Sequence, residues 1–206
     1  MTGLIDQPRN ARSRRTAREL LTAARTLIEE GGFAAMTMAA VAERAGVTRR
    51  AVYLHFATRA QLLAALFRHV NEEAGLAESV ARVWAAPDAV AALDEWAAHT
   101  ARFAPRILPV ARAVERVDRD DPDAALHREQ AARGRRESCR RLMRALADEG
   151  RLKPGWTVAG ATDMMLALSS LDVVETLLVE RRWSRQRFTA HYSMLLRDTF
   201  VGAGPS

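Results

Sequence analysis

Apolar residues recur at helical spacing twice between positions 37 and 56, once on each side of Gly46. The positions that would share a buried face are Met38, Val41, Ala42 and Ala45 in the first run and Val52 and Phe56 in the second. Thr37 and Thr48 precede the two runs and belong to a residue type that caps helix N-termini, while glycine takes the positive φ at which helices often end. This pattern predicts a helix-turn-helix.

Amphipathic helical patterns also precede and follow this segment. An earlier helix is expected from about Ser13 to Glu30, ending at the pair Gly31-Gly32. A capping-box pattern starts a further helix at Thr58, which extends toward Ala85 with a bend at Gly75. Later helices, with no competing strand pattern, are expected over residues 88–102, 105–119, 122–149, 157–182 and 184–201.

These patterns predict an all-α protein of about nine helices. An N-terminal arm followed by a three-helix helix-turn-helix domain is expected over residues 1–57, and a C-terminal helical bundle over residues 58–206. The 206 residues are 49% hydrophobic, which is enough to bury the cores of one or two domains of ordinary size. We therefore expect two helical domains, linked by the helix that starts at Thr58.

The helix expected over residues 157–182 is apolar on nearly every side rather than along one stripe. A soluble helix of this kind is buried on more than one face. One face can pack within its own domain while another packs, together with the last helix, against a second copy of the chain. This predicts a twofold homodimer through the last two helices, with the central helix of a monomeric bundle as the alternative.

Charge is concentrated near the helix-turn-helix. The chain has 31 basic and 25 acidic residues, a formal charge of +6, which is compatible with nucleic acid or another anionic surface. Residues 1–58 contain nine arginines against five acidic residues, so the excess lies in the N-terminal quarter. A basic helix-turn-helix is suited to double-stranded DNA, because a short helix can enter the major groove while its flanks meet phosphates.

The sequence also indicates in which cellular compartment the protein lies. A single cysteine, Cys139, excludes an intrachain disulfide and fits a reducing cytoplasm, although its arginine-rich surroundings leave a redox-sensing thiol open as an alternative. The N-terminus lacks the apolar run of a secretion signal, and no stretch approaches the ~20 apolar residues of a membrane span. We expect a cytoplasmic protein without a membrane partner.

An ordered set of residues around the turn carries a family resemblance. It consists of Thr37, Val41, Ala45-Gly46-Val47, Thr48, Tyr53, His55-Phe56 and Thr58. In this order the chain resembles the N-terminal DNA-binding domain of TetR-type (tetracycline-repressor-like) bacterial transcriptional regulators, over roughly residues 12–70. The resemblance implies a homodimeric repressor that binds a palindromic operator and is released by a small-molecule effector in its C-terminal domain. A dimeric DNA-binding protein without such a ligand, and a helical enzyme or ligand carrier, are the alternatives.

The resemblance and the residue chemistry together predict the DNA contacts. The predicted residues are Thr37, Thr48, Arg49, Arg50, Tyr53, His55 and Arg59. Arg49 and Arg50 begin the recognition helix, where a guanidinium matches guanine O6 and N7 or binds phosphate. Hydroxyl, phenol and imidazole groups donate to phosphate oxygens without reading bases. Arg50 stands where many family members have glycine or another small residue, and Arg59 where lysine is commoner.

Effector-binding residues are predicted on weaker grounds. Trp96, His99 and Phe103 lie at helical spacing and can share one face, and Met164 adds an apolar side chain from a later helix. These side chains predict that the effector is an apolar or aromatic molecule. The alternative is that they are ordinary core residues, since aromatic residues at helical spacing are more often core than pocket.

No enzyme motif accompanies these features. Glu95 with His99, and His69 with Glu73, stand four residues apart, but neither pair has a third metal ligand in a recognisable motif, and helix salt pairing explains both. The chain contains no nucleophile-elbow, phosphate-loop or dinucleotide-binding glycine pattern. We expect a protein that is not an enzyme and uses no metal or other cofactor.

Overall fold

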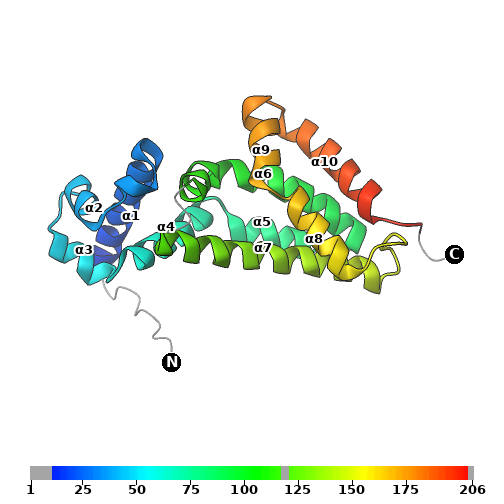
Figure 1. The fold of residues 1–206 in the computed structure, drawn as a ribbon, viewed down its shortest axis with the longest axis horizontal. Coiled ribbons are helices and arrows are strands. Elements are labelled where there is room, and N and C mark those ends of the chain that lie inside the picture. Colours follow the sequence, from blue (N-terminus) through cyan, green and yellow to red (C-terminus); the bar gives the residue numbers. More distant parts are fainter. Residues whose placement is uncertain (1–10, 117–120, 204–206) are drawn as a thin grey trace. The chain divides into compact units, whose positions relative to one another are not determined.

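The computed structural model describes residues 11–116 and 121–203, and in these ranges the chain forms helices and no strand (Figure 1). The α-helices are α1 Ala11–Gly31, α2 Met38–Arg44, α3 Arg49–His55, α4 Arg59–Glu73, α5 Leu76–Trp84, α6 Ala89–Glu115, α7 Pro122–Asp148, α8 Val158–Leu168, α9 Leu171–Val174 and α10 Arg185–Phe200. A 3₁₀ turn, η1, spans Phe33–Ala35, and a π-helical segment, η2, spans Glu175–Glu180. The all-α fold class expected from the sequence is confirmed. Most of the expected N-terminal arm lies outside the described residues.

Contacts divide the chain into two compact units. The N-terminal unit comprises Met1–Val70 and Val110–Arg128, and the C-terminal unit comprises Asn71–Pro109 and Glu129–Ser206. Helices α4, α6 and α7 each contribute residues to both units. No described helix is long and apolar enough to cross a membrane.

The N-terminal unit is organised around α1. Its fully or nearly fully buried side chains are Leu20, Ala24, Ile28, Phe33, Met36, Val41, Val52, Leu62, Leu63 and Leu66. The two motif helices begin where the sequence predicts, because Thr37 accepts the Ala40 N–H and Thr48 accepts the Ala51 N–H, at 3.1 and 3.2 Å. Gly46 takes φ 66° between them, the conformation that the turn requires.

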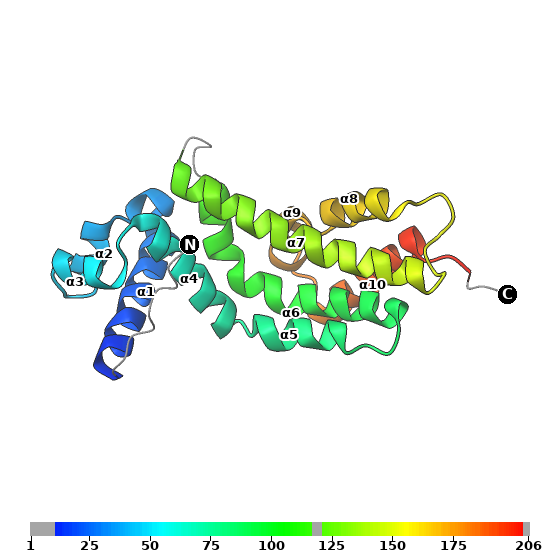
Figure 2. The same cartoon turned by 90° about the horizontal axis from the view of Figure 1, so that it is seen from below.

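In the C-terminal unit, α5, α6 and α7 run side by side in both views, with α8 and α10 beside them (Figures 1 and 2). Their shared core includes Leu93, Trp96, Ala97, Leu142, Met143, Leu146, Met165, Phe188, Leu196 and Phe200. The Trp156 indole N–H donates to the Thr199 carbonyl at 2.8 Å, which ties the α7–α8 loop to α10.

One expected helix boundary is absent. The sequence predicts separate helices over residues 88–102 and 105–119, whereas α6 is continuous and contains Pro105 and Pro109. The buried face of Ala101, Ala104 and Leu108 continues through the first proline. Packing along this face therefore outweighs the cost of about 3 kcal/mol that proline imposes inside a helix.

A second difference is the break in the apolar helix expected over residues 157–182. Helix α8 ends at Leu168, with Ser169 as its C-cap, and α9 starts after Ser170, which has extended backbone. The Tyr192 hydroxyl donates to the Leu168 carbonyl at 3.1 Å and lies 3.3 Å from Ser169 Oγ. The break is stable because Tyr192 from α10 supplies a partner that a continuous helix would not need.

The bend expected at Gly75 is a complete helix break, in which Gly75 has φ 74° and separates α4 from α5. A Cβ here would meet no atom within 4 Å, so only the backbone conformation disfavours a side chain.

We expect Gly75→Ala to lower the free energy of unfolding by about 1 kcal/mol, because alanine rarely adopts a positive φ. Gly134→Ala is the matched control, since Gly134 lies inside α7 with equally open space around it. There the same change should raise stability by about 0.5–1 kcal/mol through helix propensity. Urea unfolding measures both, and equal effects would contradict this role of Gly75.

Candidate nucleic-acid interface

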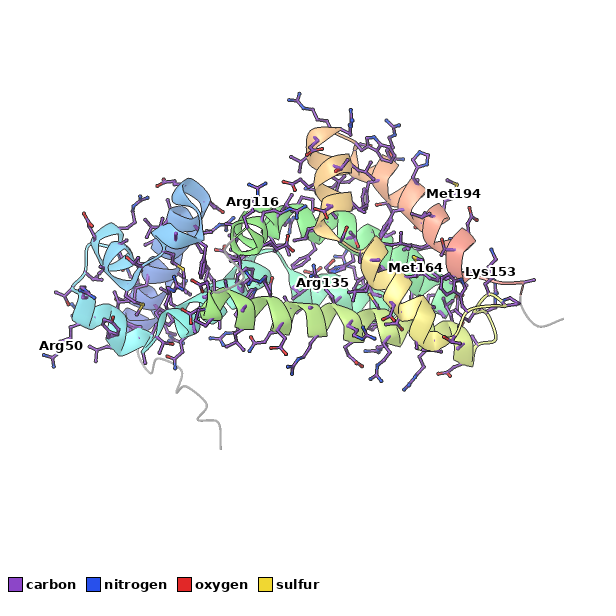
Figure 3. The ribbon with its side chains drawn as sticks, in the orientation of Figure 1. Arg50, Arg116, Arg135, Lys153, Met164 and Met194 are labelled. Atoms are coloured by element: carbon purple, nitrogen blue, oxygen red, sulfur yellow. The ribbon has the colours of Figure 1, made fainter. Side chains whose placement is uncertain are left out.

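Helix α3 is oriented by what it buries. Val52 is fully buried and Phe56, at the end of the helix, is 8% exposed, so the opposite side of the helix faces solvent. Arg50 is exposed there, Arg49 is exposed at the first position of the helix, and neither forms an ion pair within the described part of the chain. Figure 3 shows Arg50 pointing outward from the end of the N-terminal unit. These exposed positions are the open face of α3, which therefore carries two unneutralised guanidinium groups.

The remaining motif residues predicted to contact DNA lie near this face. Tyr53 is 46% exposed, and His55 is half-buried with its ring 6.2 Å from that of Phe56. Thr37 and Thr48 are exposed caps, and each hydroxyl oxygen already accepts a backbone N–H. Their hydroxyl hydrogens remain able to donate to a phosphate oxygen.

Leu54 is a member of this face that the sequence reasoning missed. Its side chain is 79% exposed, the most open of the large apolar residues in the described chain. It follows Arg50 by four residues and so lies on the same side of α3. An apolar side chain at such a position can contact the methyl group of thymine. The four-residue spacing between Arg50 and Leu54 is the feature of the sequence that could have identified Leu54.

Salt pairing reduces the basic surface that the sequence suggests. Arg44 donates to Glu30 at 2.8 Å, Arg15 pairs with Glu19, and Arg25 pairs with Glu29. Arg59 is also paired, with Asp121 and Asp123, and its side chain is only 26% exposed. The structure thus brings Thr48, Arg49, Arg50 and Tyr53 together on α3 but does not place Arg59 on the same open surface.

A family model described as bacterial regulatory proteins, tetR family, matches residues 20–66. This range covers most of α1, the whole of α2 and α3, and the first half of α4. The TetR resemblance expected from the sequence is confirmed over these residues, which form a TetR-family DNA-binding domain. In it, α3 occupies the place of the recognition helix in the helix-turn-helix.

Solved structures share the TetR fold over almost the whole chain. NalD, the secondary repressor of the MexAB-OprM multidrug efflux pump in Pseudomonas aeruginosa, is 21% identical, with a TM-score of 0.74 over 93% of this chain and 98% of NalD. The SmeT–triclosan complex is 20% identical, with a TM-score of 0.72 over 92% and 93%. A protein from Saccharomonospora viridis assigned as a transcriptional regulator, in complex with choline, is 17% identical, with a TM-score of 0.69 over 92% and 100%. No curated protein sequence matches the chain.

In the C-terminal unit, three of the four residues predicted to bind an effector form one cluster. The His99 ring lies 5.2 Å from that of Trp96 and 5.3 Å from that of Phe103, with the latter pair stacked. Met164 is 42% exposed on α8 (Figure 3), whereas Trp96 and His99 are buried, each 6% exposed. A pocket of about 240 Å³ on α7, lined by Glu137, Arg140, Arg141, Arg144, Ala145 and Asp148, includes none of the four.

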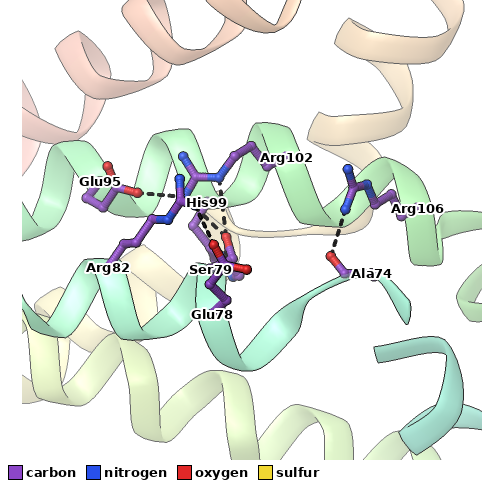
Figure 4. Close-up of polar contacts among 8 residues, drawn as sticks. All are labelled: Ala74, Glu78, Ser79, Arg82, Glu95, His99, Arg102 and Arg106. Carbon is purple, nitrogen blue, oxygen red and sulfur yellow. Dashed lines mark hydrogen bonds and ion pairs between the residues drawn. The ribbon is translucent and has the colours of Figure 1, made fainter. Parts of the chain in front are cut away.

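A partly buried polar network borders the cluster (Figure 4). Ser79 Oγ from α5 lies 2.9 Å from His99 Nδ1, and Arg102 Nη2 donates to the same oxygen at 3.1 Å and to Glu95 at 2.6 Å. Glu95 thus pairs with Arg102 rather than acting with His99 as the metal-ligand pair considered from the sequence. Arg106 donates to the Ala74 carbonyl, which lies just beyond the end of α4.

This network surrounds His99 with hydrogen-bonding groups. Burial lowers its pKa to about 4, and the positive charge of Arg102 acts in the same direction, so the ring is neutral near pH 7. Ser79 Oγ accepts from Arg102 and can either donate its hydrogen to His99 Nδ1 or accept from Nδ1–H, so Nε2 is a donor in one tautomer and an acceptor in the other. The indole Nε1 of Trp96 is a donor that is buried without a hydrogen-bond partner among the described residues.

Cys139 does not have the surroundings of a reactive thiol. Its side chain is fully buried in the core of the C-terminal unit. Burial raises the pKa of the thiol to about 11, despite a hydrogen bond with Ser169 and the charge of Arg135, which both act to lower it. The redox-sensing alternative considered from the sequence therefore has no support, because a sensor needs an accessible thiolate.

Proposed function

We propose that this TetR-family regulator is a homodimeric repressor that binds a palindromic operator and releases it when a small molecule binds its C-terminal unit. The open face of α3, with two arginines that have no ion-pair partner among the described residues, is the observation that carries the DNA-binding part. Arg49 and Arg50 read base edges, while Thr37, Thr48, Tyr53 and His55 contact the phosphate backbone.

Replacing Arg49 and Arg50 by alanine should weaken binding of a duplex enriched by the wild-type protein from a random pool. Loss of one base-reading arginine costs about 1–3 kcal/mol, so the double variant should lose at least tenfold in affinity and most of its preference over scrambled duplex. Fluorescence anisotropy measures both quantities. Arg68→Ala, an exposed arginine of α4, is the control. Unchanged selectivity in the double variant would show that α3 does not read the bases.

Dimerisation is supported by apolar side chains that remain exposed near the C-terminus. The residues concerned are Met164 on α8, Val179 on η2, and Met194 and Leu195 on α10, each 42–54% exposed. Large apolar side chains gathered on one part of a surface mark interaction sites. A second copy of the chain would cover them and place two α3 helices over half-sites roughly 34–36 Å apart, or a multiple of one helical turn.

Leu195→Glu should shift the protein from dimer to monomer in sedimentation velocity, because it places a charge in the proposed interface. We expect the dimer dissociation constant to rise by at least about tenfold, which corresponds to ~1.4 kcal/mol. Leu126→Glu is the matched control, since Leu126 is similarly exposed, 48% against 44%, but lies on α7 in the N-terminal unit. A wild-type protein that is monomeric at micromolar concentration would contradict the dimer.

The effector site is proposed at Trp96, His99 and Phe103. Two of the similar structures contain a small molecule, triclosan in one and choline in the other, which supports a ligand-responsive protein. The cluster combines aromatic rings with the donor Nε1 of Trp96, so it suits an apolar or aromatic molecule that carries a hydrogen-bond acceptor. That Met164 binds the effector remains a prediction from the sequence alone, because Met164 is not part of the cluster. Release of DNA requires the effector to bind one dimer conformation more tightly than the other.

Thermal-shift screening of aromatic acceptor compounds should yield a ligand that stabilises the protein and also dissociates the selected duplex. Trp96→Phe keeps the ring and removes the N–H, so it should weaken that ligand by about tenfold. Trp183→Phe, in the loop before α10, is the control. A ligand that stabilises without releasing DNA would contradict the effector role, and unchanged affinity in Trp96→Phe would contradict the site.

A further inference from the structure

Arg59, the first residue of α4, makes three guanidinium contacts within the N-terminal unit. Its Nε donates to Asp123 at 2.8 Å, and its Nη2 donates to Asp121. The guanidinium carbon also lies 4.7 Å from the centre of the Phe33 ring. All three charged side chains are at most 26% exposed, so these contacts are partly shielded from solvent and salt.

The two carboxylates stand at the start of α7. Asp121 Oδ1 accepts the backbone N–H groups of Asp123 and Ala124, at 3.1 and 3.0 Å, and thereby caps the helix. Burial acts to raise the pKa of Asp121, but the Ala124 N–H and Arg59 outweigh it and hold the pKa below its ordinary value. Asp121 is therefore an ionised cap that binds Arg59 with its second oxygen.

A second contact joins the same two helices. The Phe67 ring on α4 stacks on the His127 ring on α7, with 3.6 Å between ring centres and 23° between planes. Burial lowers the pKa of His127 to about 4, so the ring is neutral and suited to this apolar contact near pH 7. The first half of α4 is thus attached to the first turns of α7 at two points about two helical turns apart along α4.

The attachment lies close in sequence to the DNA-reading helix. Helix α3 ends at His55 and α4 begins at Arg59, and the connection between them is tightly held. Phe56 is buried, Thr58 Oγ1 accepts the Gln61 N–H at 3.1 Å, and Gln61 Oε1 accepts the Ala57 N–H at 2.9 Å. A displacement of the start of α4 is therefore passed to α3 through a short, hydrogen-bonded connection.

We propose that Arg59 is a positioning residue, which fixes α3 for DNA binding by holding the start of α4 against the start of α7, and that it is not a phosphate contact. The inference rests on the proposed DNA-binding function. Movement of Arg59 to a phosphate would leave two partly buried carboxylates without their cation and beside an anionic ligand. The cost of that separation favours the observed pairing.

Arginine rather than lysine is required for this role. A guanidinium offers several N–H donors in a fixed plane and can serve two carboxylates while stacking on a ring. A lysine ammonium keeps the charge but lacks this planar geometry. Arg59→Lys therefore separates the two interpretations, since a phosphate contact tolerates lysine whereas the two-carboxylate contact does not.

The test uses the full-length protein and the selected duplex, with anisotropy measured between about 0.1 and 0.4 M salt. We expect Arg59→Lys and the double variant Asp121→Asn with Asp123→Asn each to weaken binding by about fivefold or more. The slope of affinity against salt should stay as in the wild type. Asparagine retains helix capping, so the double variant removes the ion pairs alone. Arg68→Lys, the same change on the exposed side of α4, is the control and should have no effect.

Wild-type affinity in Arg59→Lys, with a slope shallower by about one in Arg59→Gln, would identify a phosphate contact and overturn the proposal. Tighter binding by the double aspartate variant would overturn it as well. Hydrogen exchange of the free protein gives a readout independent of DNA: amides over residues 48–58 should exchange faster in Arg59→Lys and in the double variant than in Arg68→Lys. Unchanged exchange would overturn the proposal, whereas faster exchange in a protein that selects no duplex would leave it standing and contradict only the proposed function.

Discussion

The recognition helix cannot maintain its own structure. Helix α3 has seven residues, far fewer than the roughly 12–15 that an isolated helix needs to be even marginally stable in water. It is held by burial of Val52 and Phe56, by the Thr48 cap and by its packing on α2. The face that α3 presents to a ligand is consequently decided by tertiary contacts and by its cap, so residues that bury or cap α3 affect DNA binding through its structure.

The contacts of α4 extend this constraint to the start of α7. The N-terminal unit includes Val110–Arg128 as well as the helix-turn-helix, so the ends of two long helices form part of the body that carries α3. Arg59 and Phe67 make the connection from α4. Because α6 also carries Trp96, His99 and Phe103, the proposed effector site and the support of the reading helix share one continuous helix. An effector that changes the conformation of α6 would thus act on a helix common to both sites.

Much of this arrangement could be predicted from the sequence. The caps Thr37, Thr48 and Thr58, the positive φ of Gly46 and the buried positions Val41 and Val52 are local signals, and the structure has them as expected. Continuity of α6 through Pro105 and the helix break at Ser169 could not be predicted, because each depends on partners distant in sequence, such as Tyr192. The same holds for Arg59. Its position suggested DNA, and only the fold brings it to two aspartates more than sixty residues away.

The central claim is that two copies of α3 read DNA as a symmetric pair. Selection of bound sequences from a random duplex pool by the full-length protein tests this most directly. The account predicts an enriched inverted repeat whose half-sites are separated by about one helical turn of DNA or a multiple of it, with binding that weakens steeply as salt rises. Enrichment of a single unrepeated site would contradict the symmetric pair, and the absence of any enriched sequence would contradict sequence-specific reading by α3.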